Sequence, residues 1–253
     1  MQGKVALITG SSRGIGHFMA VELAKAGADI VVAARSEQEP DPRLPGTIHS
    51  VAAEISALGR RALPVRMDLT KDEEVEQGVQ QAIAEFGRID VLINNAGIMA
   101  PAPLVDLPMK RWDLVMRVNV RGAVVATKAV LPHMMERKSG TIIFISSVAA
   151  EMSGAGNISY AVSKLSLEKI AQGLAEEVRD DGISVFGLAP RSLVITPGNS
   201  FVRGDARPEG IAIEPPEQMG QAAIYLCSDD AKQYSGHTFY SDAAAARRGE
   251  PVR

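Results

Sequence analysis

The sequence predicts an α/β fold, a doubly wound parallel sheet of about seven strands with helices on both faces. Two observations predict it. Short apolar runs bounded by glycine or charged residues alternate along the chain with longer stretches that have the apolar spacing of helices. The short runs are apolar at nearly every position, which is typical of strands buried on both faces. Strand–helix–strand units of this kind are right-handed, so neighbouring strands should run parallel.

The expected elements follow in chain order. We expect strands at Val5–Thr9, Ile30–Ala33, Ala62–Met67, Val91–Asn94, Thr141–Ile145 and Ser184–Leu188. We expect helices at Ile15–Ala26, Ile48–Leu58, Glu73–Phe86, Arg111–Met135 and Ser159–Val178. Thr70 and Glu73 have the spacing of a capping box and should begin the third helix. Two proline-rich segments, Ser36–Gly46 and Arg191–Pro216, are expected to be loops.

Composition limits the classes of function. The 253 residues are expected to form one domain, 1–253, near the upper size limit for one hydrophobic core. A net charge of -3 without a basic stripe gives no electrostatic support for a nucleic-acid or membrane partner. The single cysteine, Cys227, cannot form an internal disulfide, as expected in a reducing compartment. No apolar run approaches the ~18 residues of a membrane span. We therefore expect a cytoplasmic protein, and no metal site.

A glycine-rich turn follows the first expected strand and opens into the first helix, at Thr9–Gly16. Its glycines, Gly10, Gly14 and Gly16, would let the backbone turn tightly and approach a pyrophosphate. The start of the helix offers free amides and a partial positive charge. A purely structural turn is the alternative. Its place at the first strand–helix junction favours nucleotide binding, because ligands of such sheets bind beyond the carboxyl ends of the strands.

The end of the second expected strand bears on the type of nucleotide. NAD-binding sites usually place a carboxylate here for the adenosine ribose, but this chain has Ala34 followed by Arg35. Arg13 of the glycine turn should approach the same region. Two guanidiniums can hold a 2′-phosphate by forked, charge-assisted hydrogen bonds, which favours NADP(H). The alternative is two solvated surface arginines.

Tyr160 and Lys164 have the i, i+4 spacing that places two side chains on one face of a helix. A free phenol has a pKa of about 10, and a nearby cation lowers it. Tyr160 could then exchange a proton with an alkoxide or alcohol. Ser146 and Ser147 end the fifth expected strand, where a hydroxyl could polarise a carbonyl. Asn119 lies among apolar residues, where its amide could hold a water, a backbone kink or a structural hydrogen bond.

Five motifs in order resemble the short-chain dehydrogenase/reductase family: T-G-x-x-x-G-I-G at Thr9–Gly16, N-N-A-G at Asn94–Gly97, Asn119, Ser147, and Y-x-x-x-K at Tyr160–Lys164. The resemblance runs from Lys4 to about Asp242. It implies a Rossmann-type fold and a nicotinamide cofactor, with NADP(H) preferred here and NAD(H) possible. It also implies a small-molecule carbonyl or alcohol substrate and assembly as a homotetramer or homodimer.

The same resemblance implies roles for individual residues. Asn119 would serve a water relay, Ser147 would polarise the substrate, and Tyr160 would transfer the proton. Lys164 would bind the nicotinamide ribose and lower the pKa of Tyr160, while Asp68 would meet the adenine. The residues expected to contact the cofactor are Gly10, Ser12, Arg13, Gly14, Ile15, Gly16, Arg35, Asp68, Leu69, Asn95, Ala96, Gly97, Tyr160, Lys164, Pro190, Val194 and Thr196.

A closer similarity is to the hydroxysteroid-dehydrogenase-like branch, carried by Pro42–Ile48, Asn119–Gly122 and Ala189–Ser192. This branch is poorly defined in substrate. The chain departs from the family's usual Pro-Gly after the sixth strand, because Arg191 follows Pro190, so the loop must take a different path. Val194 and Thr196 are then the candidates to hold the carboxamide. Arg191 could reach an anionic substrate or lie on the surface.

The function expected from these residues is an NADP(H)-preferring oxidoreductase that interconverts a carbonyl and a secondary alcohol. One alternative is a 3-oxoacyl thioester reductase, which would need a basic patch to dock an acyl carrier. Another is a catalytically silent, nucleotide-sensing protein with the same fold. The substrate is not readable from the sequence. The loop at about 191–214 could form an apolar pocket with a mobile lid or remain a surface loop.

Overall fold

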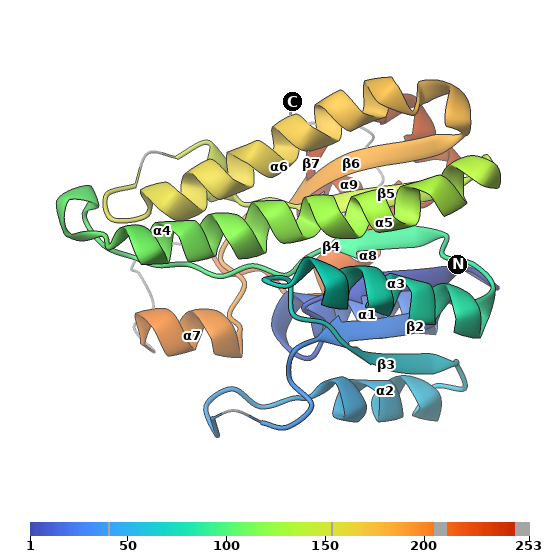
Figure 1. Ribbon diagram of the computed structural model, residues 1–253, viewed down its shortest axis with the longest axis horizontal. Coiled ribbons are helices and arrows are strands. Elements are labelled where there is room, and N and C mark those ends of the chain that lie inside the picture. Colours follow the sequence, from blue (N-terminus) through green and yellow to red (C-terminus); the bar gives the residue numbers. More distant parts are fainter. Residues whose placement is uncertain (40, 153, 205–211, 246–253) are drawn as a thin grey trace.

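A computed structural model describes residues 1–39, 41–152, 154–204 and 212–245 of the chain. Its centre is one seven-stranded sheet in the order β3-β2-β1-β4-β5-β6-β7 (Figure 1). All of its strand pairs are parallel. The strands are β1 (Val5–Thr9), β2 (Asp29–Ala34), β3 (Ala62–Arg66), β4 (Val91–Asn94), β5 (Gly140–Ile145), β6 (Ile183–Ala189) and β7 (Thr238–Tyr240). The predicted doubly wound parallel sheet is confirmed.

The α-helices of the described residues connect the strands and cover the sheet. They are α1 (Gly14–Lys25), α2 (Ile48–Ala57), α3 (Asp72–Phe86), α4 (Met109–Met116), α5 (Gly122–Glu136), α6 (Ile158–Glu177), α7 (Pro197–Arg203), α8 (Glu217–Leu226) and α9 (Ser241–Ala245). Within the part of the chain that the structure describes, none of the helices combines the length and apolar character needed to cross a bilayer.

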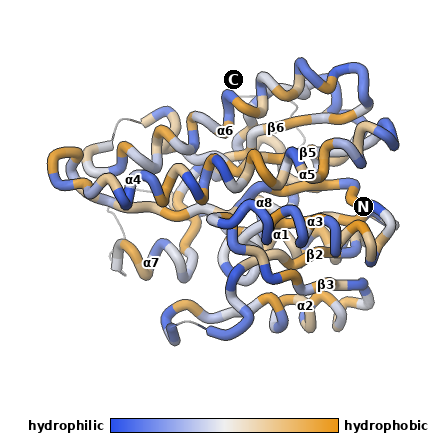
Figure 2. The backbone as a smooth tube through the Cα atoms, viewed as in Figure 1, coloured by the Kyte–Doolittle hydropathy of each residue, from blue (hydrophilic) through white to orange (hydrophobic). Residues whose placement is uncertain are grey.

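Two hydrophobic cores lie on opposite faces of the sheet. In β1, Ala6 and Ile8 belong to one core, which α1, α2 and α8 cover. Val5 and Leu7 of the same strand belong to the other core, which α3, α5 and α6 cover. Figure 2 shows the strands predominantly orange, with blue segments on the outer turns and loops. Burial of both faces explains why the strands are apolar at consecutive positions.

Two local predictions are wrong. Thr70 and Glu73 do not form a capping box, because α3 begins at Asp72 and its N-cap residue, Lys71, makes no side-chain cap. The Thr70 hydroxyl instead donates to Asp68 at 2.8 Å.

The second error is the loop expected over Arg191–Pro216. Its residues 205–211 lie outside the described part, but its first half contains the short helix α7. Thr196 and Asn199 start that helix with a reciprocal capping box, in which each side chain bonds the other residue's backbone N–H. The Ser36–Gly46 segment, where described, contains neither helix nor strand.

The single helix expected over Arg111–Met135 is interrupted. It consists of α4, a five-residue π-helical turn at Arg117–Arg121, and α5. Such a turn accommodates one extra residue and frequently occurs at functional sites. Asn119 lies at its centre and is completely buried.

Candidate active site

The predicted site residues converge at the carboxyl ends of the central strands. The glycine turn follows β1, Asn95–Gly97 follows β4, Ser146 and Ser147 follow β5, and Pro190 follows β6. In a doubly wound sheet the ligand crevice lies at this edge, where the order of the strands reverses. Here the reversal falls between β1 and β4.

Two glycines of the turn are required by close packing of the backbone. A Cβ atom on Gly10 would lie 2.8 Å from the Cα of Ala96, and one on Gly16 would lie 2.5 Å from Nδ2 of Asn95. Asn95 Nδ2 donates to the carbonyl of Thr9 at 2.8 Å and to that of Gly10 at 3.2 Å. The N-N-A-G segment therefore braces the glycine turn, a role that its sequence did not reveal.

Gly14 begins α1 with φ +61°, a left-handed conformation that favours glycine. The preceding residue, Arg13, gives the helix no side-chain cap. Ser12 is buried behind the turn, and Ile15 packs against the core. A helix start without a side-chain cap can receive a pyrophosphate, so these residues fit the phosphate portion of a dinucleotide.

Arg13 is held by the loop that follows β2. Its Nη2 donates to the carbonyl of Gly46 at 2.7 Å and its Nε to that of Pro45 at 3.2 Å. Burial lowers the pKa of Arg13; the nearby Glu39 raises it and Arg35 lowers it further. Arg13 is therefore not a freely solvated arginine. Arg35 is exposed and close enough to repel it, so an anion between the two guanidiniums would relieve the repulsion.

Asp68 and Leu69 follow β3 at the same edge. Oδ1 of Asp68 accepts hydrogen bonds from the backbone N–H of Thr70 at 2.9 Å and from its hydroxyl at 2.8 Å, which fix the carboxylate. Leu69 is buried against α5, where a Cβ on Gly122 would lie 2.6 Å from the Leu69 Cβ.

Lys164 is almost completely buried on the inner side of α6, with 2% of its surface exposed. Its Nζ donates to the carbonyl of Ile145 at 2.7 Å, at the end of β5, and lies 5.5 Å from the centroid of the Tyr160 ring. Burial lowers the pKa of Lys164 to about 8. The predicted pair therefore forms on one helix face, with the cation beside the phenol ring.

Asn119 joins the π-helical turn to the segment after β4. Its Oδ1 accepts from the N–H of Ile98 at 2.8 Å, and its Nδ2 donates to the Ile98 carbonyl at 2.9 Å. Nδ2 also donates to the hydroxyl of Ser163 at 2.9 Å. A Cβ on Gly97 would lie 3.3 Å from Lys164 Nζ and 3.6 Å from Asn119 Oδ1. Glycine here keeps open the space in front of both side chains.

The two serines after β5 differ in their surroundings. Ser146 is buried, and its hydroxyl donates to Glu168 of α6. Ser147 is partly exposed, and its Oγ accepts from the N–H of Ala149 at 3.2 Å. Ser147 is therefore the more accessible of the two serines.

The sequence profile of a family described as "short chain dehydrogenase" matches residues 4–206. The chain belongs to the short-chain dehydrogenase/reductase family. Members of this family are oxidoreductases that use NAD or NADP. Hydroxysteroid dehydrogenase-like protein 2 from Homo sapiens is 37% identical over 206 residues, covering 81% of this chain and 49% of that protein. The chain therefore spans about half the length of the curated relatives it matches, and it lies near their branch.

Two solved structures are similar over nearly the whole chain. A putative dehydrogenase from Xanthomonas campestris has a TM-score of 0.86 and 32% identity, covering 98% of this chain and 90% of that one. A short-chain type dehydrogenase/reductase from Mycobacterium marinum has a TM-score of 0.83 and 28% identity, covering 94% of both chains.

In this short-chain dehydrogenase/reductase, the segment after β6 begins with Pro190 and Arg191. The Cζ atom of Arg191 lies 4.5 Å from the centroid of the Tyr240 ring, on which the guanidinium stacks. Nε of Arg191 lies 3.8 Å from Oδ2 of Asp242. Of the two positions that the sequence left open for Arg191, the structure shows the one on the surface. Val194 is buried, and Thr196 lies next to the glycine turn, since a Cβ built on Gly14 would lie 3.4 Å from the Thr196 Cβ.

Several residues of the site were missed from the sequence. Ser163 lies inside the Y-x-x-x-K motif, and its hydroxyl donates to the Tyr160 carbonyl at 2.7 Å. That position within the motif was an available signal. Ile98, Glu168 and Glu214 act through contacts with distant parts of the chain, so no local pattern marks them.

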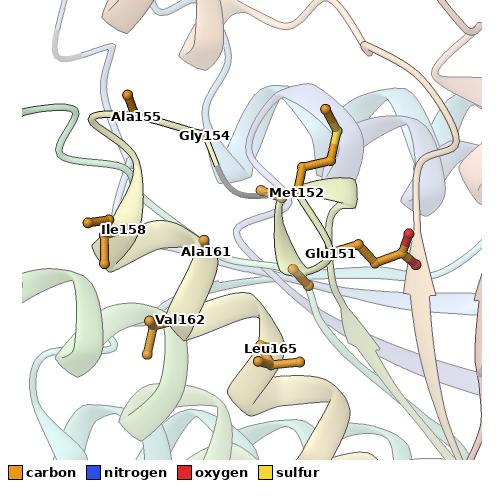
Figure 3. Close-up of a pocket in the computed structure, with 10 residues that line it drawn as sticks. Glu151, Met152, Gly154, Ala155, Ile158, Ala161, Val162 and Leu165 are labelled. Carbon is orange, nitrogen blue, oxygen red and sulfur yellow. The ribbon is translucent and has the colours of Figure 1, made fainter.

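A hollow of about 420 Å³ lies on the other side of α6 (Figure 3). Ile158, Val162 and Leu165 line it and are exposed, whereas Ser163 and Lys164 are buried. Lys164 belongs to the inner side of the helix and does not line this hollow, whereas Ala149 and Ala150, which closely follow Ser147, do line it.

Proposed function

We propose that the chain is an NADP(H)-preferring oxidoreductase that interconverts a carbonyl and a secondary alcohol, with Tyr160 as acid/base. The observation that carries the proposal is the buried Lys164 ammonium 5.5 Å from the Tyr160 ring centroid. Burying a cation costs free energy, which a purely structural position would avoid with an apolar side chain. A cation beside a phenol favours its ionised form, which suits a group that exchanges protons.

In the proposed reduction, the Tyr160 hydroxyl gives its proton to the carbonyl oxygen as that oxygen gains negative charge. The Ser147 hydroxyl donates a hydrogen bond to the same oxygen and polarises the carbonyl. The nicotinamide, when bound, supplies the hydride that reaches the carbonyl carbon. In oxidation, the Tyr160 phenolate removes the proton from the alcohol. Asn119 positions the helix that carries Tyr160 through its hydrogen bond to Ser163.

The preference for NADP(H) rests on charge. β2 ends at Ala34, which has no carboxylate, and Arg35 follows it. Burial lowers the pKa of Arg13, and Arg35 lies close enough that its charge lowers this pKa further. A 2′-phosphate between two guanidiniums would be stabilised by charge-assisted hydrogen bonds, whereas an unphosphorylated ribose would bring no negative charge to the two cations. Glu39 also lies near Arg13, and its negative charge reduces the preference for NADP(H). Glu39 does not stand at the end of β2, where NAD sites place the carboxylate that binds the ribose.

The test is a fluorescence titration of the purified chain with NADPH and NADH, followed by turnover on a panel of aldehydes and ketones. We expect tighter binding of NADPH and turnover with at least one substrate class. Tight binding without turnover on any member of the panel would favour the nucleotide-sensing alternative. Absence of binding to both cofactors would contradict the proposal.

A further inference from the structure

Glu214 is a buried carboxylate three residues before the start of α8, with 6% of its surface exposed. Its Oε2 accepts a hydrogen bond from the backbone N–H of Ser192 at 2.8 Å. Its Oε1 accepts one from the hydroxyl of Ser241 at 2.6 Å. The Ser241 oxygen in turn accepts the backbone N–H of Arg191 at 3.2 Å. One carboxylate therefore fixes two consecutive backbone positions, directly and through one hydroxyl.

The segment held in this way leads to the glycine turn. Leu193 pairs with the strand-like residues before Glu214: its N–H donates to the Ala212 carbonyl at 3.1 Å, and its carbonyl accepts the Glu214 N–H at 3.1 Å. Val194 is buried next in the chain, and Thr196 lies next to Gly14, since a Cβ built on Gly14 would lie 3.4 Å from the Thr196 Cβ. Glu214 thus anchors the start of a segment that passes beside the phosphate-binding turn.

This arrangement has an electrostatic cost. Burial raises the pKa of Glu214, and the neighbouring Asp242 raises it further, while the hydrogen bonds from Ser241 and Ser192 oppose the shift. The charged groups facing Glu214 are Asp242 of α9 and Arg191, whose guanidinium is stacked on Tyr240. A carboxylate that is buried at such a cost indicates that the fold requires hydrogen-bond acceptors at these positions, for the Ser192 N–H and the Ser241 hydroxyl.

We propose that Glu214 is a positioning residue of the cofactor site: it holds segment 191–196 against the glycine turn so that Val194 and Thr196 meet the nicotinamide half of the cofactor. The inference rests on the proposed function.

Hydrogen exchange of the purified chain tests the anchoring independently of activity. In Glu214→Ala, the amides of 192–194 should exchange about tenfold faster, because the Ser192 N–H loses its acceptor. Glu214→Gln keeps one acceptor oxygen and should show a smaller increase. The matched control is Glu217→Ala, three residues further on in α8, which should leave these amides unchanged. Equal exchange in Glu214→Ala and wild type would overturn the proposal.

Cofactor binding tests the consequence. The Kd for NADPH should rise about tenfold in Glu214→Ala, with partial recovery in Glu214→Gln and no change in Glu217→Ala. Ser241→Ala removes one donor to Glu214 and should weaken binding in the same direction, which covers the case of a poorly folded Glu214→Ala. If wild type binds neither NADPH nor NADH, the proposed function fails and the role of Glu214 fails with it. Normal wild-type binding with unchanged binding in Glu214→Ala and Ser241→Ala overturns only the positioning role.

Discussion

The Nζ atom of Lys164 lies 5.5 Å from the centroid of the Tyr160 ring, one helical turn away on the inner side of α6. The same nitrogen donates to the Ile145 carbonyl at the end of β5. Burial lowers the pKa of Lys164 to about 8, so the amine remains mostly protonated at pH 7. The fold therefore keeps a cation in a buried place beside the proposed acid/base.

The substitution Lys164→Met should abolish activity and raise the free energy of unfolding at pH 7. Between pH 8 and 10.5, the folded wild type binds fewer protons than the unfolded chain, so its stability rises with pH in that window. The variant lacks this titration. At pH 7 it should gain up to about 3 kcal/mol from removal of the buried charge, less about 1 kcal/mol for the lost hydrogen bond.

Urea denaturation at pH 7 and pH 10 measures this difference, and turnover should be lost at both. A variant whose stability relative to wild type improves on going from pH 7 to pH 10 would contradict the stated sign.

Asn119→Ala should destabilise the chain and impair turnover. The buried Asn119 side chain makes three hydrogen bonds, two partly buried ones with the backbone of Ile98 and a buried one with Ser163. Their loss leaves buried polar groups without partners and should cost about 2–4 kcal/mol. Asn157→Ala is the control, because Asn157 precedes α6 without a side-chain cap. Thermal unfolding compares them, and equal melting temperatures would show that the π-helical turn does not depend on Asn119.

The positions of six strands and of most helices along the chain could be predicted from the sequence, because a strand buried on both faces is apolar at consecutive positions. β7 was not predicted, because a strand of three residues is too short to show a recognisable run of apolar residues. The capping box expected at Thr70 does not form because α3 begins at Asp72, which makes Lys71 the N-cap residue. Thr196 and Asn199, which do cap a helix, stand among prolines and glycines that suggested a loop.

The candidate site was predicted where motifs are local, as at Tyr160 and Lys164. What the sequence could not reveal are partners brought close by the fold. Glu214 reaches Ser192 across a separation of 22 residues, and Asn95 reaches Thr9 across 86. No periodicity or spacing records such pairs, because they depend on the positions of the strand ends.

Arg35→Ala should reduce the preference for NADPH over NADH. Loss of one charge-assisted hydrogen bond to the 2′-phosphate should weaken NADPH binding about 10–100-fold while leaving NADH binding nearly unchanged. Arg179→Ala, an exposed arginine after α6, is the control. Fluorescence titrations with both cofactors give the ratio of Kd values. If the ratio of the Kd values for NADPH and NADH is the same in Arg35→Ala and wild type, Arg35 does not bind the 2′-phosphate.

Cys227 should be unreactive in the native protein. It is buried, and burial raises the pKa of its thiol to about 12. The thiolate is the reactive form, so iodoacetamide at pH 7.5 should label Cys227 only after unfolding in denaturant. Mass spectrometry counts the label. Rapid labelling of the folded chain would show that α8 opens locally at its end.

The central claim is that Tyr160 transfers the proton. The most direct measurement is single-turnover oxidation of bound NADPH by Tyr160→Phe and wild type on the best substrate of the panel, with Tyr234→Phe as the control. Removing only the hydroxyl should slow the reaction by roughly 10²–10⁴-fold with little change in NADPH affinity. Wild-type rates in Tyr160→Phe would contradict the account and require another acid/base.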